Sequence, residues 1–222
     1  MKKPDKDILD RLRGKKPSLG SSSTQAAATA NDAQRAAAEA AAAVKAAAKR
    51  AEELAFIDSC RKNYLGNVRD ALAAGMNPNV VNDHGVSGLM MAVAKGHIQI
   101  VALLLEYQAD VNTQSNHGGD ALLSALEANK PMLVDYLLRA GANPNRCYHQ
   151  GLTALMIAAR DGQWRMVKAL LKAGADPSVK DMRGKTALDH AKKRHHSGVI
   201  NLLEQQAQPA AVRRRRQPHL VQ

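Results

Sequence analysis

The stretch GLTALMIA, from Gly151 to Ala158, decides the fold, because its pattern returns every 33 residues along the chain. Five columns keep this spacing over four units, and each column holds one kind of residue. They are Gly85, Gly118, Gly151 and Gly184; Leu89, Leu122, Leu155 and Leu188; Ala92, Ala125, Ala158 and Ala191; Val101, Val134, Val167 and Ile200; and Leu104, Leu137, Leu170 and Leu203. A repeat of this length is typical of proteins built from stacked units.

Each unit is predicted to form two short helices. Two positions after the glycine stands Ser87, Asp120, Thr153 or Thr186, whose side chains can accept a hydrogen bond at a helix start. The Leu and Ala columns then lie one turn apart on a buried face. In the first full unit we predict a second helix over residues 98–107, with one apolar face made of Ile98, Val101, Leu104 and Leu105. Glycine or a substitute ends these helices, at Gly96, Asn129, Gly162 and His195 for the first helices and at Gln108, Gly141 and Gly174 for the second.

The chain resembles the ankyrin-repeat family. The family pattern Gly-x-Thr-Pro-Leu-His-x-Ala is matched by residues 151–158, and the later pattern Gly-His-x-x-Val-x-x-Leu-Leu is matched by residues 96–104. The proline and the histidine of the first pattern are absent from every unit. The resemblance covers residues 52 to about 205. It implies a β-turn and two antiparallel helices per unit, stacked into a curved solenoid.

We therefore predict an all-α ankyrin-repeat solenoid over residues 52–206, in which helix-turn-helix units are joined by β-hairpin turns. Terminal repeats have only one neighbour, so we expect them to be atypical. The first unit fits this expectation, because Phe56 takes the Leu column. The predicted units are an N-terminal cap at 52–80, full repeats at 81–113, 114–146 and 147–179, and a C-terminal cap at 180–206.

The flanks have a different composition. Residues 1–23 are predicted to be a disordered basic tail, because they hold little that could build a core. Residues 24–51 are rich in alanine and are predicted to form a helix of about 25 to 30 residues. This helix is either a solvated spacer or a partner-binding helix. Residues 207–222 are predicted to be a second disordered tail, with four consecutive cations at Arg213, Arg214, Arg215 and Arg216.

Cysteine usage and hydropathy favour a reducing compartment. The only cysteines, Cys60 and Cys147, cannot build a disulfide framework within one chain. The first 20 residues have no apolar run, which argues against a secretory signal. The sequence contains no uninterrupted apolar stretch of about 18 residues, so we expect no membrane span. We expect a cytoplasmic monomer, with a secreted effector that lacks a cleavable signal as the alternative.

Motifs for catalysis and for cofactor binding are weak. Cys60 falls in a helix column that is expected to be core, and Cys147 with His149 lacks a third group to orient the pair. The histidines near the hairpin tips stand one repeat apart, and helices pack about 8–10 Å apart, so their rings would converge on a metal only with difficulty. We therefore expect no enzyme activity, no cofactor and no metal.

Binding of a protein partner is the predicted function, as an adaptor, scaffold or inhibitor. In the family that the chain resembles, hairpin tips and the exposed side of the first helices form a concave binding face. The corresponding residues are His84, Lys95, Gln114, His117, Glu127, His149, Arg160, Asp161, Met182, Arg183, Lys193 and Arg194. Within this set Lys95, Glu127, Arg160 and Lys193 form a row with three basic members, which favours an acidic or polar partner.

The charge distribution leaves a second function open. The net charge is +12, of which residues 1–50 carry +6, residues 51–205 carry +2 and the last 17 residues carry +4. Basic tails could tether the chain to nucleic acid or to another acidic surface.

Overall fold

The computed structural model describes the backbone of residues 22–207 and the side chains of residues 34–206. Within this part the structure holds ten α-helices, one 3₁₀ turn and no β-strand, only two isolated β-bridges. The prediction of an all-α solenoid is confirmed. The chain divides into two compact units, Met1–Arg50 and Ala51–Gln222. The predictions for residues 1–21 and 208–222 lie outside the described residues.

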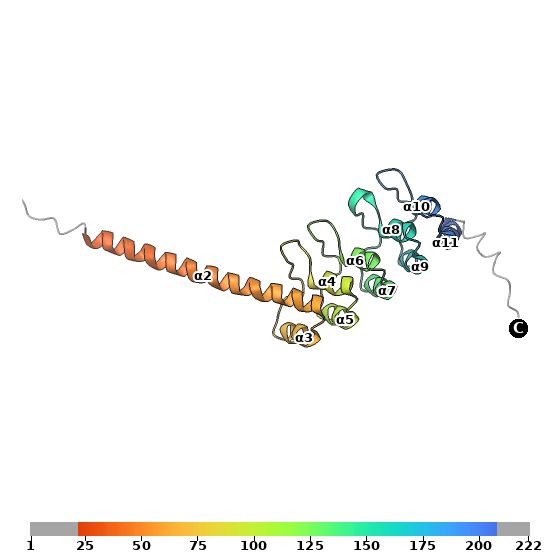
Figure 1. Cartoon of the computed structure of the whole chain (residues 1–222). Helices are drawn as coiled ribbons and strands as arrows, with labels where there is room; N and C mark the ends of the chain where they lie inside the picture. Colours follow the sequence, from red (N-terminus) through yellow and green to blue (C-terminus); the bar gives the residue numbers. More distant parts are fainter. Residues whose placement is uncertain (1–21, 208–222) are drawn as a thin grey trace, which may run out of the picture. The chain divides into compact units, whose positions relative to one another are not determined.

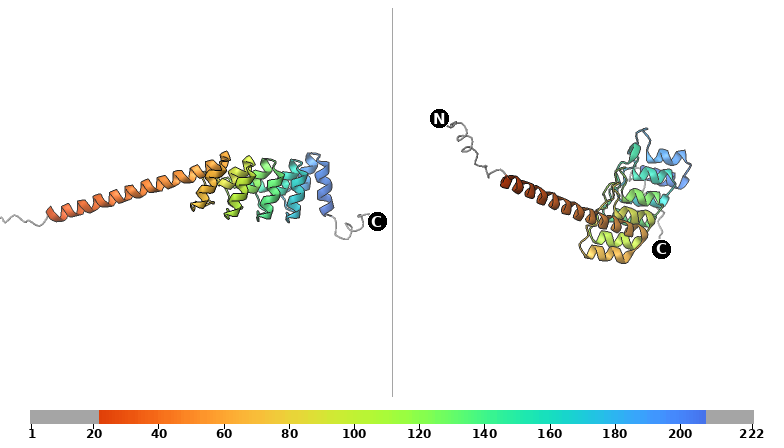
Figure 2. Two further views of the ribbon diagram at one scale, coloured as in Figure 1. Left: turned by 90° about the horizontal axis from the view of Figure 1, so that it is seen from below. Right: turned by 60° about the vertical axis from the view of Figure 1, so that its left-hand side comes forward.

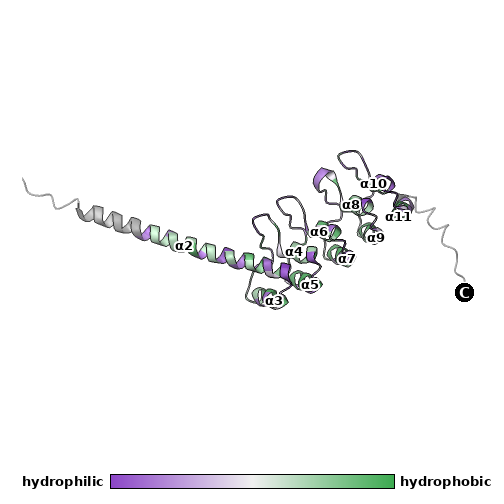
Figure 3. Cartoon of the chain, in the orientation of Figure 1, coloured by the Kyte–Doolittle hydropathy of each residue, from purple (hydrophilic) through white to green (hydrophobic). Residues whose placement is uncertain are grey.

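Helix α2 (Ser22–Lys62) is 41 residues long, which is longer than the sequence predicted. No glycine or proline interrupts this run, so no helix end separates the alanine-rich segment from the first repeat helix. Every side chain from residue 34 to residue 49 is exposed. Figure 3 shows this part of α2 as pale green alanine interrupted by purple charged residues. The helix ends at Asn63, which has a φ of 65°.

The second unit is a stack of helix pairs in two layers (Figures 1 and 2). We call α4, α6, α8 and α10 the inner helices, and α3, α5, α7, α9 and α11 the outer helices. A hairpin loop joins each outer helix to the next inner helix. The bounds are α3 (Leu65–Ala73), α4 (Gly88–Lys95), α5 (Ile98–Glu106), α6 (Ala121–Glu127), α7 (Pro131–Arg139), η1 (His149–Gly151), α8 (Ala154–Arg160), α9 (Trp164–Lys172), α10 (Ala187–Lys193) and α11 (Ser197–Ala207).

The inner helices begin where the sequence predicted. The side chains of Ser87, Asp120, Thr153 and Thr186 each accept a hydrogen bond from the backbone N–H three residues later. At the last of these helices the Asp189 carboxylate also accepts from the Thr186 backbone N–H, which closes a capping box. These bonds satisfy N–H groups that a helix start leaves without a partner.

The predicted glycine substitutes adopt the left-handed backbone conformation. The φ angles are 51° at Asn129, 58° at His195 and 61° at Gln108. This conformation is strained for a residue with a Cβ, but it turns the chain between the two helices of a unit or into the next hairpin.

Four of the five columns lie in the core, with an informative exception at the C-terminal end, whereas the glycine column lies in the hairpin loops. In the three full repeats the Leu, Ala and Val columns are almost fully buried, as at Leu155, Ala158 and Val167. In the last unit Leu188 and Ile200 are only half-buried. No helix that the structure describes follows α11 to cover these side chains, which fits a unit with only one described neighbour.

One assignment on the second helix is wrong. Ile98 was placed on the buried face of its helix, but its side chain is 49% exposed. Ile100 takes the buried place instead, together with Val101 and Leu104. Ile98 is the first residue of α5, where the chain has just turned away from the inner helix.

Candidate functional site

The predicted site residues lie at the hairpin tips and at the C-terminal ends of the inner helices. Among the twelve, Arg160 is half-buried and the others are exposed. Met182 is the most exposed large apolar side chain of the described residues, at 82%. His84, His117 and His149 stand on three successive hairpins, and none is part of a metal site. Among the described residues, no group of three or more His, Cys, Asp or Glu side chains could hold a metal ion.

Hydrogen bonds join neighbouring hairpins. Asn116 N donates to the His84 carbonyl at 2.9 Å, and Asn116 Nδ2 donates to the Asp83 carbonyl at 3.0 Å. Further along the stack, Met182 N donates to the Gln150 carbonyl at 3.1 Å. The first and second hairpin tips, and likewise the third and fourth, are therefore held backbone to backbone.

The predicted row occupies the C-terminal ends of the four inner helices. Lys95, Glu127, Arg160 and Lys193 are the last residues of α4, α6, α8 and α10. Because these inner helices pack against one another in order, the row has a spacing of about 10 Å per step. The ring of His196 also lies 3.0 Å from the Arg160 carbonyl, which ties the end of α8 to the last unit.

Part of the predicted set comes together around a hollow of about 150 Å³ between the third repeat and the C-terminal unit. We call it the basic hollow. Its predicted members are Arg160, Arg183, Lys193 and Arg194, and the members that sequence reasoning missed are Gln150, Leu152, Asp181 and His190. The other predicted residues do not line it. The sequence offered no signal for the missed members, because they meet only when the hairpin and α10 of one unit stack on the hairpin and α8 of the previous unit.

Asp181 organises one wall of the basic hollow. Its carboxylate accepts hydrogen bonds from the backbone N–H groups of Lys185 and Arg183, each at 2.8 Å. His190 Nε2 lies 2.8 Å from the same carboxylate. These bonds, with the Lys185 N–H as the largest cause, lower the pKa of Asp181 below its ordinary value. The ionised carboxylate is thus held within the hairpin, and it forms no ion pair with the described arginine or lysine side chains that line the hollow.

The cations of the basic hollow are mostly unpaired. Arg160 Nε lies 2.9 Å from Asp161 Oδ1, so this arginine is partly neutralised. Arg183, Lys193 and Arg194 form no ion pair with any side chain that the structure describes. The arrangement can therefore attract a small acidic group, because unpaired cations around a hollow create a local positive potential.

A separate ionisable cluster is buried between the second and third repeats. The Asp120 carboxylate accepts from Leu123 N at 2.8 Å and from the Tyr148 hydroxyl at 3.0 Å, and Arg146 Nε lies 3.1 Å away. Burial raises the pKa of Asp120 in spite of these partners. Because Asp120 starts a helix of one repeat while Arg146 and Tyr148 belong to the boundary with the next, the cluster joins two repeats.

The two cysteines differ in exposure. Cys60 is fully buried, as predicted, and burial raises the pKa of its thiol to about 12. The thiolate is the nucleophilic form, so this cysteine is inert at neutral pH. Cys147 is exposed, and its backbone forms an isolated β-bridge with Thr153.

Comparison with protein families decides the identity of the fold. A family model described as ankyrin repeats (3 copies) matches residues 56–147 and residues 122–212. The chain belongs to the ankyrin-repeat family. Ankyrin repeats generally mediate protein–protein interactions. Comparison with curated proteins gave no match. Within the described residues of this ankyrin-repeat chain, no helix has both the length and the apolar character that a membrane crossing needs.

Proposed function

We propose that the ankyrin repeats bind an acidic segment of a partner protein at the hairpin side, with the basic hollow as the centre of the interface. The observation that carries the proposal is the gathering of four cations, three of them unpaired, around one hollow of about 150 Å³. Arginine binds a carboxylate through two parallel hydrogen bonds, which gives such a site both strength and direction.

The size of the basic hollow favours a protein partner over nucleic acid. A space of this volume accepts one or two carboxylate side chains, and a few anchors of this kind dominate most protein interfaces. The surrounding repeats are close to neutral, since residues 51–205 carry a net charge of only +2. On this basis the chain acts as an adaptor, scaffold or inhibitor in the cytoplasm, as a monomer and without catalysis.

The uneven charge of the chain favours a second candidate function. Residues 1–50 and the last 17 residues carry +6 and +4, so the tails could hold the chain on nucleic acid while the repeats act as a spacer. Phosphate contacts release counterions, so such binding weakens steeply as salt rises. Binding of one acidic peptide in the basic hollow should weaken much less between 50 mM and 200 mM salt.

The test uses acidic peptides selected by display against the full-length chain. We expect Arg160→Glu to raise the dissociation constant of the best peptide by about tenfold or more, because it places a like charge beside the incoming carboxylate. Arg69→Glu is the matched control, since it makes the same charge change on the outer helix α3, outside the basic hollow. The proposal is wrong if Arg69→Glu does the greater damage, or if Arg160→Glu leaves the dissociation constant unchanged.

A further inference from the structure

Exposed apolar side chains gather on the outer helices. Ile98 on α5 is 49% exposed, Met132 and Tyr136 on α7 are 75% and 38% exposed, and Trp164 on α9 is 52% exposed. Scattered single apolar residues are normal on a protein surface, but a group on adjacent elements marks an interaction site. These side chains are not part of the hydrophobic core. They lie on the outer helices, whereas the basic hollow is formed by hairpins and inner helices.

Two hollows accompany these side chains, one on each side of α7. The hollow between α5 and α7 has a volume of about 320 Å³ and is lined mainly by apolar atoms, including those of Ile98, Ala102 and Tyr136. The hollow between α7 and α9 has a volume of about 350 Å³. Met132 lines both, so the two hollows form one surface that crosses α7. We call this surface the outer groove.

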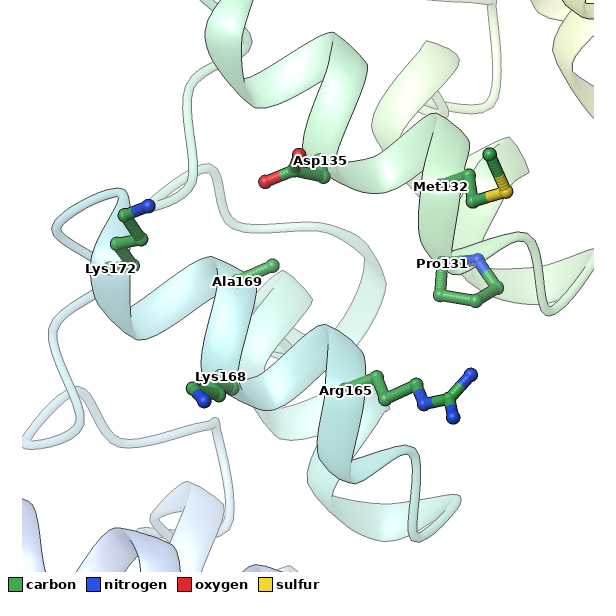
Figure 4. Close-up of a pocket in the computed structure, with 7 residues that line it drawn as sticks. All are labelled: Pro131, Met132, Asp135, Arg165, Lys168, Ala169 and Lys172. Atoms are coloured by element: carbon green, nitrogen blue, oxygen red, sulfur yellow. The ribbon is translucent and has the colours of Figure 1, made fainter.

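The side of the outer groove on α9 is basic. Arg165, Lys168 and Lys172 line it at a spacing that places them along one face of the helix. Figure 4 shows these three side chains along α9, with Asp135 and Met132 across the gap on α7. The row is about 10 Å long, since a helix rises about 1.5 Å per residue.

The cations on α9 have no counterions among the described side chains. Asp135 is the acidic residue that lines the outer groove, and it is already paired with Arg139 at 2.5 Å. Arg165 lies over the ring of Trp164, 5.5 Å from its centroid, and makes no ion pair within residues 34–206. The outer groove therefore combines an apolar lining on α5 and α7 with unpaired cations on α9. A ligand with one apolar side and one acidic side would complement both.

We propose that the outer groove binds an amphipathic helix of a partner protein, one whose apolar stripe is flanked by Asp and Glu. Neighbouring helices pack about 8–10 Å apart, so a partner helix fits over Met132 with its apolar residues toward Ile98 and Tyr136. Its acidic flank then faces Lys168 and Lys172. In helix-in-groove binding of this kind, the partner helix carries its apolar anchor residues at positions i, i+3, i+4 and i+7.

Two other occupants fit less well. A second copy of this chain offers the exposed helix segment 34–50, but that segment carries four cations and one acid, so it would repel the basic edge. An anionic membrane would match the charges, but a flat surface leaves the hollows beside α7 unfilled. The partner helix is distinct from the acidic segment proposed for the basic hollow, so the chain can bridge two partners.

The experiment uses the full-length chain and a designed 14-residue helical peptide with a leucine stripe and a glutamate flank. Trp164 is the only tryptophan of the chain, and its ring contacts Arg165, which lines the outer groove, so the Trp164 emission is the signal for binding. A peptide with lysine in place of each glutamate is the charge control. We expect the glutamate peptide to bind at least about tenfold more tightly than the lysine peptide.

Variants of the chain locate the binding. Met132→Lys should raise the dissociation constant of the glutamate peptide by about tenfold, because truncating or charging a central anchor removes much of the binding energy. Since Met132 is 75% exposed, this variant should fold, and circular dichroism checks that it does. The double variant Lys168→Glu, Lys172→Glu should have a similar effect. Arg69→Glu, on the outer helix α3 and outside both the outer groove and the basic hollow, is the matched control and should leave binding unchanged.

Several outcomes would overturn the inference. It fails if Met132→Lys binds the glutamate peptide as well as the parent does, or if Arg69→Glu weakens binding equally. It also fails if anionic vesicles shift the Trp164 emission while the peptide does not, because the surface would then bind lipid. Dimerisation of the chain that Met132→Lys abolishes would show that a second copy is the occupant.

Discussion

Asp181 combines a structural and an electrostatic role in one side chain. The carboxylate holds the turn of the last hairpin through the N–H groups of Arg183 and Lys185, and it contacts His190 on α10. Its neighbour in the basic hollow, Arg183, is thereby fixed in place. A turn side chain thus positions a cation that we propose binds the partner.

We predict that Asp181→Asn lowers the melting temperature at neutral pH, because the amide binds the N–H groups and His190 less strongly than the carboxylate does. The pKa of Asp181 is lowered from 3.8 in the folded chain. A lowered pKa means that the ionised form stabilises the fold above pH 3.8, and that this contribution is lost as the pH falls through the folded value.

Thermal melts of the parent and of Asp181→Asn between pH 7 and pH 3 check this prediction. The difference in melting temperature should be nearly constant down to about pH 4 and should shrink below it. A difference that grows toward acid pH would contradict the assignment of the lowered pKa to the folded state.

At the scale of elements, the contact between α2 and α4 depends on the absence of a side chain. Helix α4 begins at Gly88, in the column where the family pattern has proline. A Cβ at Gly88 would lie 2.9 Å from Cys60 Sγ, closer than two such atoms approach in proteins. Cys60 and Gly88 therefore set how closely the two helices pack.

We predict that Gly88→Ala destabilises the chain by about 1–3 kcal/mol, as overpacking of a buried contact does. Cys60→Ala removes the sulfur that the new methyl group would strike. The double variant should therefore be more stable than the sum of the two single changes predicts. Urea unfolding of the parent, the two single variants and the double variant measures this coupling. Additive effects on the free energy of unfolding would show that the new methyl group does not clash with Cys60 Sγ.

For the whole molecule, the repeat stack should carry the folding energy. The core described above lies within residues 56–203, and the sequences of residues 1–21 and 208–222 offer few large apolar side chains. We predict that removing both segments leaves the melting temperature unchanged to within about 2 °C, the shift that a loss of less than 1 kcal/mol produces in a chain of this size.

Differential scanning calorimetry of the trimmed and full-length chains tests this. A drop of many degrees would mean that a terminal segment packs on the repeats. The same pair of chains separates the two candidate functions. If the trimmed chain keeps its affinity for the acidic peptide, the tails are not needed for the proposed binding.

The sequence by itself determined the repeat and its register. The columns of leucine, alanine and valine recur at a fixed interval, and the helix starts at Ser87 and Thr153 and the left-handed turns at Asn129 and His195 are local features. Such features depend on neighbours within a few residues, so a pattern in one dimension is enough to find them. The row from Lys95 to Lys193 was predicted in a similar way, from residues near the end of each first helix, although Lys95 lies one residue later in its unit than the other three.

Only the tertiary structure decided which side chains meet on the surface. The exposure of Ile98, which the pattern assigned to the core, depends on how α5 leaves the preceding turn. The meeting of Arg160 with Arg183 and Lys193 depends on how one unit stacks on the next. Likewise Met132 and Lys168 stand on different helices, and only side-by-side packing makes them one groove. Distances between residues in different repeats are set by packing across the stack, and that information is absent from the spacing of residues along the chain.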